Sequence, residues 1–179
     1  MITVDNTVLV VVDIQEKLTR VMSDKEALVE NAVKLVRGAN VLGVPVICTE
    51  QNPKGLGPTI PELRDLMSDV TPVSKFSFSC CGEKTFMTEL DKHDREFVLA
   101  CGIESHVCLY QTVADLIDLG YEVDVVSDVV SSRTPENRRI GLDKCKEYGA
   151  WMSGVEMALF ELLQVAEGEK FKEIIKIVK

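Results

Sequence analysis

The chain has 179 residues, of which 46% are hydrophobic and 27% are charged. These are ordinary globular proportions, so a disordered or low-complexity chain is excluded, and the length suits one domain with a sizeable core. The formal net charge of −9 makes a general grip on nucleic-acid phosphates or on an anionic membrane surface improbable. We therefore expect neither a nucleic acid nor a membrane as partner, although net charge says nothing about a small pocket.

Six cysteines are present, but the chain is not short and its first residues carry Asp5 where a secretory leader needs basic residues. No apolar run approaches the roughly 18 residues that a membrane span requires. We therefore expect reduced thiols and a cytoplasmic location. The adjacent Cys80 and Cys81 form no C-x-x-C motif, and we expect them to pack or to lie in a loop.

The first half of the chain alternates strand and helix patterns. Thr7–Val12 is almost wholly apolar and β-branched, which is typical of a strand buried on both faces. A capping box at Ser23–Glu26 predicts a helix start, apolar residues then recur at helical spacing to Leu42, and Gly43 predicts the helix end. There follow a strand at Val44–Thr49, a loop rich in Pro and Gly at Gln51–Pro61, a short strand at Thr71–Ser74 and a short helix at Glu83–Lys92.

The second half continues the alternation. The predicted elements are a strand at Phe97–Cys101, a helix at Ser105–Leu119, a strand at Val123–Val126, a helix capped by Thr134 and ended by Gly149, a short strand at Ala150–Met152, a helix opened by a capping box at Ser153–Glu156 and running to about Val165, and amphipathic turns over 171–178. This alternation predicts an α/β fold: a three-layer αβα Rossmann-like sandwich with a mainly parallel sheet of about six strands in the order 3-2-1-4-5-6. We expect one domain over 1–179.

Three reactive residues fall at the carboxyl ends of predicted strands, where ligands bind in such sheets. Asp13 ends the first strand, Lys75 follows the third, and Cys108 lies in the first turn of the helix after the fourth. Each residue alone also fits a structural role, as a turn, a solvated lysine or a core cysteine. Together they favour chemistry, because a helix start and a nearby ammonium both favour a thiolate and a carboxylate can shuttle its proton.

Several stretches resemble the isochorismatase-like cysteine hydrolase family. They are VLVVVDIQ at 8–15, VPVICTEQNPKGLGPTIPEL at 44–63, KFSF at 75–78 and CGIESHVCLYQT at 101–112. The order Asp, Lys, Cys and the element G-I-x-S/T-x-x-C are hallmarks of the family, and the similarity runs over nearly the whole chain. The loop TEQNPKGLGP and the stretch VDVVSDVVSSR at 123–133 are most similar to the isochorismatase-domain-containing subgroup.

The resemblance implies that Cys108 is the nucleophile, Asp13 the proton shuttle and Lys75 the cation that stabilises the thiolate. It also implies a non-proline cis peptide between Ile103 and Glu104, which helps to aim the N–H groups of Glu104 and Cys108 at an oxyanion. The implied reaction is hydrolysis of a small amide, less often an ester, through a thioester. Family members that cleave the vinyl ether of isochorismate use the Asp as an acid without a thiol, so that chemistry stays open, as does a catalytically idle interaction protein on the same fold.

The loop after the second strand departs from the nicotinamidases of the family. Those enzymes carry a D-x-H element and further His ligands there, whereas Thr49–Pro53 contains no His. The only histidines, His93 and His106, lie in no metal-spaced cluster, so we expect no metal and no cofactor. His106 lies two residues before the predicted nucleophile, where a helix points it to another face, and we expect it to make a local hydrogen bond. The sequence has no glycine-rich turn after the first strand, no D-x-D motif and no P-loop. These absences disfavour a dinucleotide oxidoreductase, a phosphatase with an aspartyl nucleophile and a P-loop nucleotidase.

Five further residues are candidates for lining the substrate pocket: Gln15, Glu50, Gln51, Phe76 and Arg133. Arg133 suits an anionic substrate group, but a surface ion pair is the commoner role. For Phe76 and Phe78, packing in the core is the favoured interpretation. We also expect a homo-oligomer with a small-molecule substrate, with the apolar C-terminal segment supplying the interface.

Overall fold

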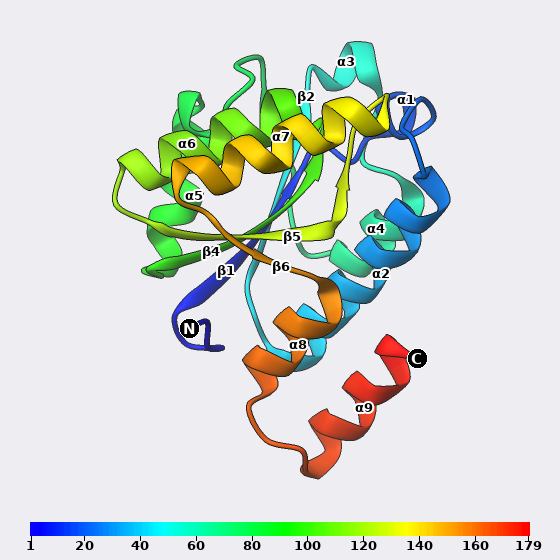
Figure 1. The fold of residues 1–179 in the computed structure, drawn as a ribbon, viewed down its shortest axis with the longest axis vertical. Coiled ribbons are helices and arrows are strands. Elements are labelled where there is room, and N and C mark those ends of the chain that lie inside the picture. The colour runs from blue at the N-terminus through cyan, green and yellow to red at the C-terminus, as the bar shows by residue number, and fades with distance from the viewer.

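The predicted strands form one six-stranded sheet, and the structure, a computed structural model, describes all 179 residues (Figure 1). The strands are β1 (Thr7–Val12), β2 (Val46–Gln51), β3 (Val73–Lys75), β4 (Phe97–Ile103), β5 (Glu122–Ser131) and β6 (Trp151–Ser153). Their order is β3-β2-β1-β4-β5-β6, and every neighbouring pair is parallel. The predicted α/β class and strand order are confirmed.

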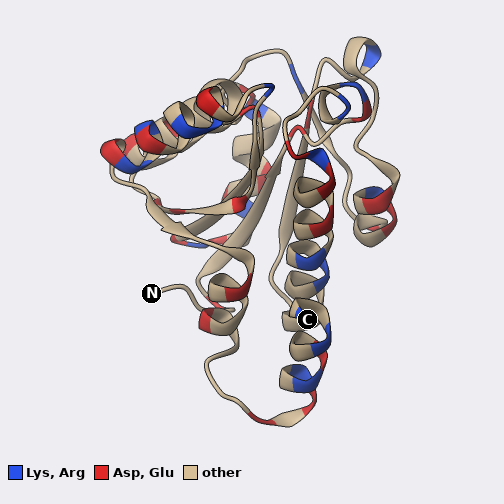
Figure 2. Ribbon diagram, turned by 45° about the vertical axis from the view of Figure 1, so that its right-hand side comes forward, with Lys and Arg blue, Asp and Glu red and all other residues tan.

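Helices cover both faces of the sheet. On one side lie α2 (Lys25–Leu42), α8 (Val155–Leu163) and α9 (Gly168–Val178), and on the other lie α5 (Lys84–His93), α6 (Tyr110–Asp118) and α7 (Pro135–Tyr148) (Figure 1). The central strand β1 is buried throughout because alternate residues face the two helical layers: Leu9 and Val11 join the α2 side, and Val8 and Val10 join the α6 side. Charged residues of both signs lie along the outer helices (Figure 2).

Short helices occupy segments where the sequence predicts loops or one longer helix. They are α1 (Glu16–Thr19), α3 (Pro53–Leu56), α4 (Pro61–Arg64) and two 3-10 turns at Asp65–Met67 and Cys80–Gly82. The helix predicted over Ser105–Leu119 begins instead as a π-helical turn at Ser105–Leu109, and α6 follows it. Such turns widen the helix locally and are common at functional sites.

Both predicted capping boxes are wrong, because tertiary partners take the serine hydroxyls. Ser23 Oγ donates to the Ser132 carbonyl at 2.8 Å, and α2 begins after Asp24, which caps nothing. Ser153 Oγ donates to Asp124 Oδ1 at 2.7 Å instead of capping α8. Thr134, in contrast, caps α7 as predicted.

The amphipathic pattern predicted over 171–178 lies within α9, whose Ile174 and Ile177 are buried in the core on the α2 side. The apolar side of the C-terminal segment is therefore used within the chain, and the predicted oligomer contact through this segment is corrected. No helix combines the length and apolar character needed to cross a bilayer.

Candidate active site

The three predicted reactive residues meet at the carboxyl ends of neighbouring strands. Asp13 directly follows β1 and adopts a positive φ of 53°, Lys75 is the last residue of β3, and Cys108 lies in the π-helical turn after β4. Lys75 Nζ lies 2.7 Å from Asp13 Oδ2, and the same carboxylate lies near enough to the Cys108 thiol to raise its pKa. The strand order explains the meeting, because β1 pairs with both β2 and β4, and β2 pairs with β3.

The Lys75–Asp13 pair is fully buried, and protein groups satisfy it. Lys75 Nζ donates to Asp13 Oδ2, to Gln51 Oε1 at 2.8 Å and to the carbonyls of Ser77 and Phe78 at 3.2 and 3.0 Å. Burial, the largest single effect, lowers the pKa of Lys75, but the Asp13 carboxylate together with the Cys80 and Cys108 sulfurs outweighs burial, and the pKa ends above its ordinary value. The lysine therefore stays charged, as a buried ion pair with completed hydrogen bonds can.

The second oxygen of Asp13 is held as well. Thr49 Oγ1 donates to Asp13 Oδ1 at 2.8 Å, so a hydroxyl fixes one oxygen and an ammonium holds the other. Thr49 belongs to β2, and its backbone carbonyl also accepts the Asp13 N–H at 3.3 Å. The carboxylate is thereby oriented from the neighbouring strand, and sequence spacing alone gave no sign of this partner.

Cys108 is a neutral thiol rather than a thiolate in this arrangement. Burial, then the Asp13 charge, raises the pKa of Cys108 to about 12, although Lys75 acts in the opposite direction. The expectation that the helix start and Lys75 would lower this pKa is wrong, because burial disfavours the thiolate most strongly and the Asp13 charge opposes the effect of the ammonium. The residue is 6% exposed, so its surroundings leave only a small opening to solvent.

A second thiol belongs to the cluster, which the sequence did not indicate. The Cys80 thiol is buried and lies 3.7 Å from Thr49 Oγ1, and its charge state acts on both Lys75 and Cys108. Burial raises the pKa of Cys80 to about 11. Thr112 links the two cysteines, because its hydroxyl accepts the Cys80 N–H at 2.9 Å and donates to the Cys108 carbonyl at 2.7 Å. All six cysteines are free.

The backbone before the π-helical turn offers an unused donor. The peptide bond between Ile103 and Glu104 is cis, as the resemblance implies. The N–H groups of Ser105, Val107 and Leu109 have acceptors within the protein, whereas that of Glu104 has none. A free N–H four residues before the Cys108 sulfur is available to an oxygen that develops negative charge.

Three of the five pocket candidates make hydrogen bonds that brace the loops around the site. Gln15 is buried and donates to the carbonyls of Gln51 and Gly57. Glu50 Oε1 accepts from the N–H and hydroxyl of Thr59. The Gln51 carboxamide joins Lys75 to the Phe76 carbonyl. These amide and carboxylate groups therefore fix the loop that surrounds Lys75.

The other two candidates are exposed beside the site. Phe76 is 77% exposed and Phe78 is 54% exposed, so the favoured prediction of core packing is wrong for both. Arg133 forms a surface ion pair, with Nε 3.1 Å from Glu104 Oε2. His106 Nδ1 lies 3.1 Å from Ser132 Oγ, which is the predicted local hydrogen bond. No group of three or more His, Cys, Asp or Glu side chains is placed to hold a metal ion.

The family model and the similar proteins all indicate the isochorismatase family. The family model "Isochorismatase domain" matches residues 7–157. Isochorismatase domain-containing protein 2 of Danio rerio is 37% identical over 172 residues, covering 96% of this chain and 86% of that protein. A secreted isochorismatase effector, Isc1, of Phytophthora sojae is 37% identical over 183 residues, covering 97% and 85%. The solved structure of the MAR1 ribonuclease from Caenorhabditis elegans superposes with a TM-score of 0.93 at 33% identity, covering 99% of this chain and 91% of that one.

Proposed function

The chain belongs to the isochorismatase family and has its hydrolase fold, and from that premise we propose that it is a metal-independent cysteine hydrolase acting on a small amide-type C–N bond. Cys108 is the proposed nucleophile, Asp13 the proton shuttle and Lys75 the cation paired with Asp13. The observation that carries the proposal is the buried cluster in which one carboxylate lies beside both the ammonium and the thiol.

The first half of the proposed reaction starts from the thiol. As the Cys108 sulfur attacks the substrate carbonyl carbon, its proton passes to Asp13, the carboxylate near the thiol. The free N–H of Glu104 and the N–H of Cys108 stabilise the oxyanion. When the C–N bond breaks, Asp13 returns the proton to the leaving amine and a thioester remains on Cys108.

The second half uses the same carboxylate on water. The amine leaves, Asp13 takes a proton from the entering water as its oxygen attacks the thioester carbonyl, and the proton then returns to the Cys108 sulfur as the acid departs. Lys75 keeps its proton throughout, because its four acceptors favour the charged ammonium. The small exposed area of Cys108 favours a small acyl group over a bulky one.

The alternative functions have less structural support than cysteine hydrolysis. Vinyl-ether hydrolysis with Asp13 as acid needs no thiol, and it offers no reason for a cysteine beside that carboxylate. The name of the C. elegans relative suggests a role on RNA. The net charge of −9 disfavours that role, because binding to RNA phosphates depends on cationic side chains. A purely binding role leaves the buried Lys75–Asp13 pair without a purpose, since such pairs add little net stability.

Intact-mass spectrometry tests the proposal directly. We expect an acyl adduct on the wild-type chain with members of a panel of small amides, carbamates and esters, and none with Cys108→Ala. Cys145→Ala, which removes a thiol of α7, is the matched control and should keep the adduct. Turnover that survives in Cys108→Ala would establish the vinyl-ether type of mechanism instead. Absence of both adduct and turnover across the panel would favour the binding role.

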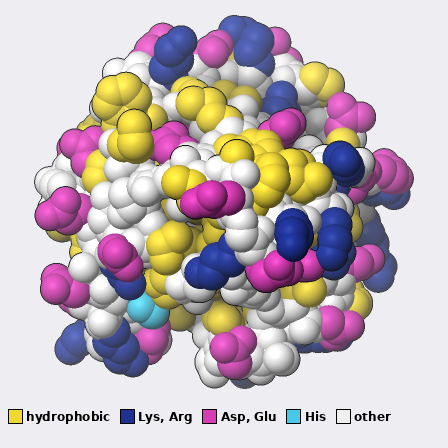
Figure 3. Space-filling view, turned by 90° about the horizontal axis from the view of Figure 1, so that it is seen from below, with side chains coloured by type: hydrophobic (Ala, Val, Ile, Leu, Met, Phe, Trp, Pro, Cys, Tyr) yellow, Lys and Arg dark blue, Asp and Glu magenta, His cyan; other side chains and the backbone are white.

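A homo-oligomer is part of the proposal, but through a different surface from the C-terminal segment. Trp151 and Met157 are 63% and 59% exposed and line a hollow of about 220 Å³ with Met1 and Met152. Seen from below, hydrophobic side chains gather in patches between charged ones (Figure 3). Sedimentation that detects only monomer at micromolar concentration would reject this part.

Two further predictions remain part of the proposal. We propose that residues 1–179 act as one isochorismatase-like domain, which limited proteolysis tests by releasing no stable fragment. We also propose a cytoplasmic location on the strength of six free cysteines, although the P. sojae relative is named as secreted. Fractionation of cells that express the chain at native level tests the location.

A further inference from the structure

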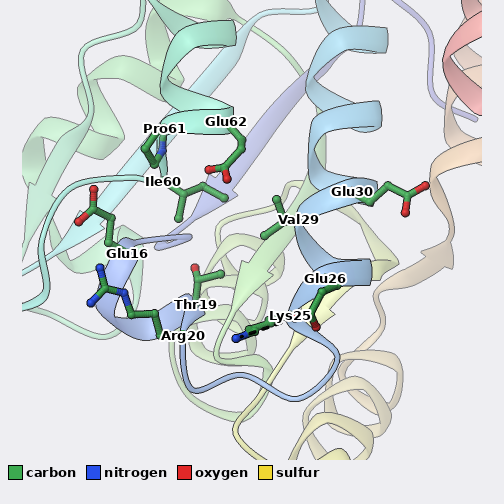
Figure 4. Close-up of a pocket in the computed structure, with 10 residues that line it drawn as sticks. All are labelled: Glu16, Thr19, Arg20, Lys25, Glu26, Val29, Glu30, Ile60, Pro61 and Glu62. Carbon is green, nitrogen blue, oxygen red and sulfur yellow. Dashed lines mark ion pairs between the residues drawn. The ribbon is translucent and has the colours of Figure 1, made fainter.

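A groove separate from the proposed active site lies between three short stretches of chain. It has a volume of about 600 Å³ and is bordered by α1, by the first turns of α2 and by the start of α4 (Figure 4). None of Asp13, Lys75 and Cys108 lines it. The groove is therefore not part of the proposed active site, and any ligand that it binds must be inferred from its own lining residues.

The floor of the groove combines apolar surface with one unsatisfied hydroxyl. Ile60 is buried and Val29 half-buried, and both point toward the groove (Figure 4). Thr19 is 6% exposed, and its Oγ1 has no hydrogen-bond partner in the protein. Buried hydroxyls almost always have a partner, so an unsatisfied one beside a groove marks a place for a polar ligand atom.

The rim carries an excess of negative charge. Four carboxylates and two cations line the groove. Glu30 is paired with Lys34 at 2.9 Å, and Glu26 lies 3.8 Å from Lys25. Glu16 and Glu62 have no ion pair, and neither has Arg20 on α1. The unpaired charged groups of the groove are thus two carboxylates on opposite borders and one guanidinium, which leaves carboxylates in excess to attract a cation from solution.

We propose that this groove binds a small alkylammonium ion. Its ammonium group donates hydrogen bonds to the Glu62 carboxylate and to Thr19 Oγ1, and its alkyl chain lies on Val29 and Ile60. A bare metal ion fits less well, because the floor is apolar and no three metal-ligating side chains converge. An anion fits less well, because carboxylates outnumber cations around the groove.

Contact with the Thr19 hydroxyl requires a small local movement. The oxygen exposes less than 1 Å² to water, so side chains around it must move before an ammonium reaches it. Arg20 lies beside Thr19 in Figure 4, is exposed and has no ion pair to hold it in place. Rearrangement of such a side chain on ligand binding is common.

The test is a methyl NMR titration of the full chain with n-butylammonium chloride. We expect saturable shifts of the methyl groups of Thr19, Val29 and Ile60 in the millimolar range. Two matched probes separate the contributions: 1-butanol has the alkyl chain without the charge, and ammonium chloride has the charge without the chain. Neither should saturate these shifts at the same concentration. No saturable shift with n-butylammonium, or equal saturation with 1-butanol, would overturn the proposal.

Variants locate the ammonium. Glu62→Gln should weaken binding about three- to tenfold, and Glu30→Gln, whose carboxylate is held by Lys34, should change it less than about twofold. Thr19→Val keeps the shape but removes the hydroxyl, so it should weaken binding by several-fold while raising the melting temperature of the free protein. Unchanged affinity in both Glu62→Gln and Thr19→Val would refute the assigned geometry, and the unperturbed methyl spectrum of each variant shows that it is folded.

Discussion

Replacement of Asp13 by Asn should lower the pKa of the Cys108 thiol and abolish turnover at the same time. Asp13 raises this pKa through its charge, whereas Lys75 lowers it. Once the carboxylate is gone, the thiolate becomes the partner of the Lys75 ammonium. More of the nucleophilic form is then present at neutral pH, but no carboxylate remains to accept and return the proton.

The size of the shift follows from Coulomb's law. A unit charge about 4 Å away contributes about 4 kcal/mol at an effective dielectric constant of about 20, and one pKa unit corresponds to about 1.4 kcal/mol. Loss of the Asp13 charge should therefore lower the pKa of Cys108 from about 12 by roughly 3 units. Burial still opposes ionisation, so the thiol is not expected to reach the acidic range of a fully activated cysteine.

Ultraviolet thiolate absorbance as a function of pH measures this shift. The Asp13→Asn titration is compared with that of the same variant carrying Cys108→Ser, so that the difference reports on one sulfur. Cys145 is the matched control, because burial raises its pKa against the opposing effect of a backbone hydrogen bond, and Asp13 does not contribute. A Cys108 midpoint that stays in place or rises, or turnover that survives, would show that the assigned electrostatics of the cluster is incorrect.

Stability measurements test the rest of the architecture. Lys75→Met should lower the free energy of unfolding in urea by about 3–5 kcal/mol, because Asp13 is left buried and unpaired. Since the pKa of Lys75 is raised, the difference between wild type and this variant should be constant from neutral pH to the ordinary lysine pKa of 10.5 and shrink as the pH rises through the higher folded-state value. A difference that already shrinks as the pH rises from neutral to 10.5 would contradict this. Gly102→Ala should destabilise more than about 3 kcal/mol, because φ is +126° and the new Cβ would meet the Val12 backbone, whereas Gly43→Ala, in open space at a φ of 84°, should cost only about 1 kcal/mol; equal losses would refute the close approach.

The α/β class was predictable from alternation along the chain, and the meeting of Asp13, Lys75 and Cys108 was predictable once the common order 3-2-1-4-5-6 was assumed. A parallel sheet covered by helices places every strand end on one edge, so residues that follow strands converge there. The same reasoning could not find Thr49 or Cys80. Thr49 reaches Asp13 through the register of β2 against β1, and Cys80 enters the cluster through a 3-10 turn, and neither placement leaves a local pattern in the sequence.

Local motifs failed where a tertiary partner offered a better bond. Ser23 fits a capping box by spacing, yet its hydroxyl donates to the carbonyl of Ser132, which directly follows β5 and is far away in the sequence. The thiolate prediction failed for a related reason. A helix start and a lysine are visible in sequence, but the burial of the Cys108 thiol and the approach of the Asp13 carboxylate, which together outweigh the lysine, arise only on folding.

The electrostatics of the folded cluster explains why a neutral thiol is compatible with catalysis. Before attack, the charges of Asp13 and Lys75 cancel and the Cys108 thiol is neutral. After attack, Asp13 carries the proton, Lys75 keeps its charge, and the oxyanion beside the Glu104 N–H supplies the negative charge. The buried site is thus net neutral on both sides of the step, so no net charge has to be created in a poorly solvated place. A preformed thiolate beside the ionised Asp13 would instead place two anions against one ammonium, and the raised pKa of Cys108 expresses the cost of that state.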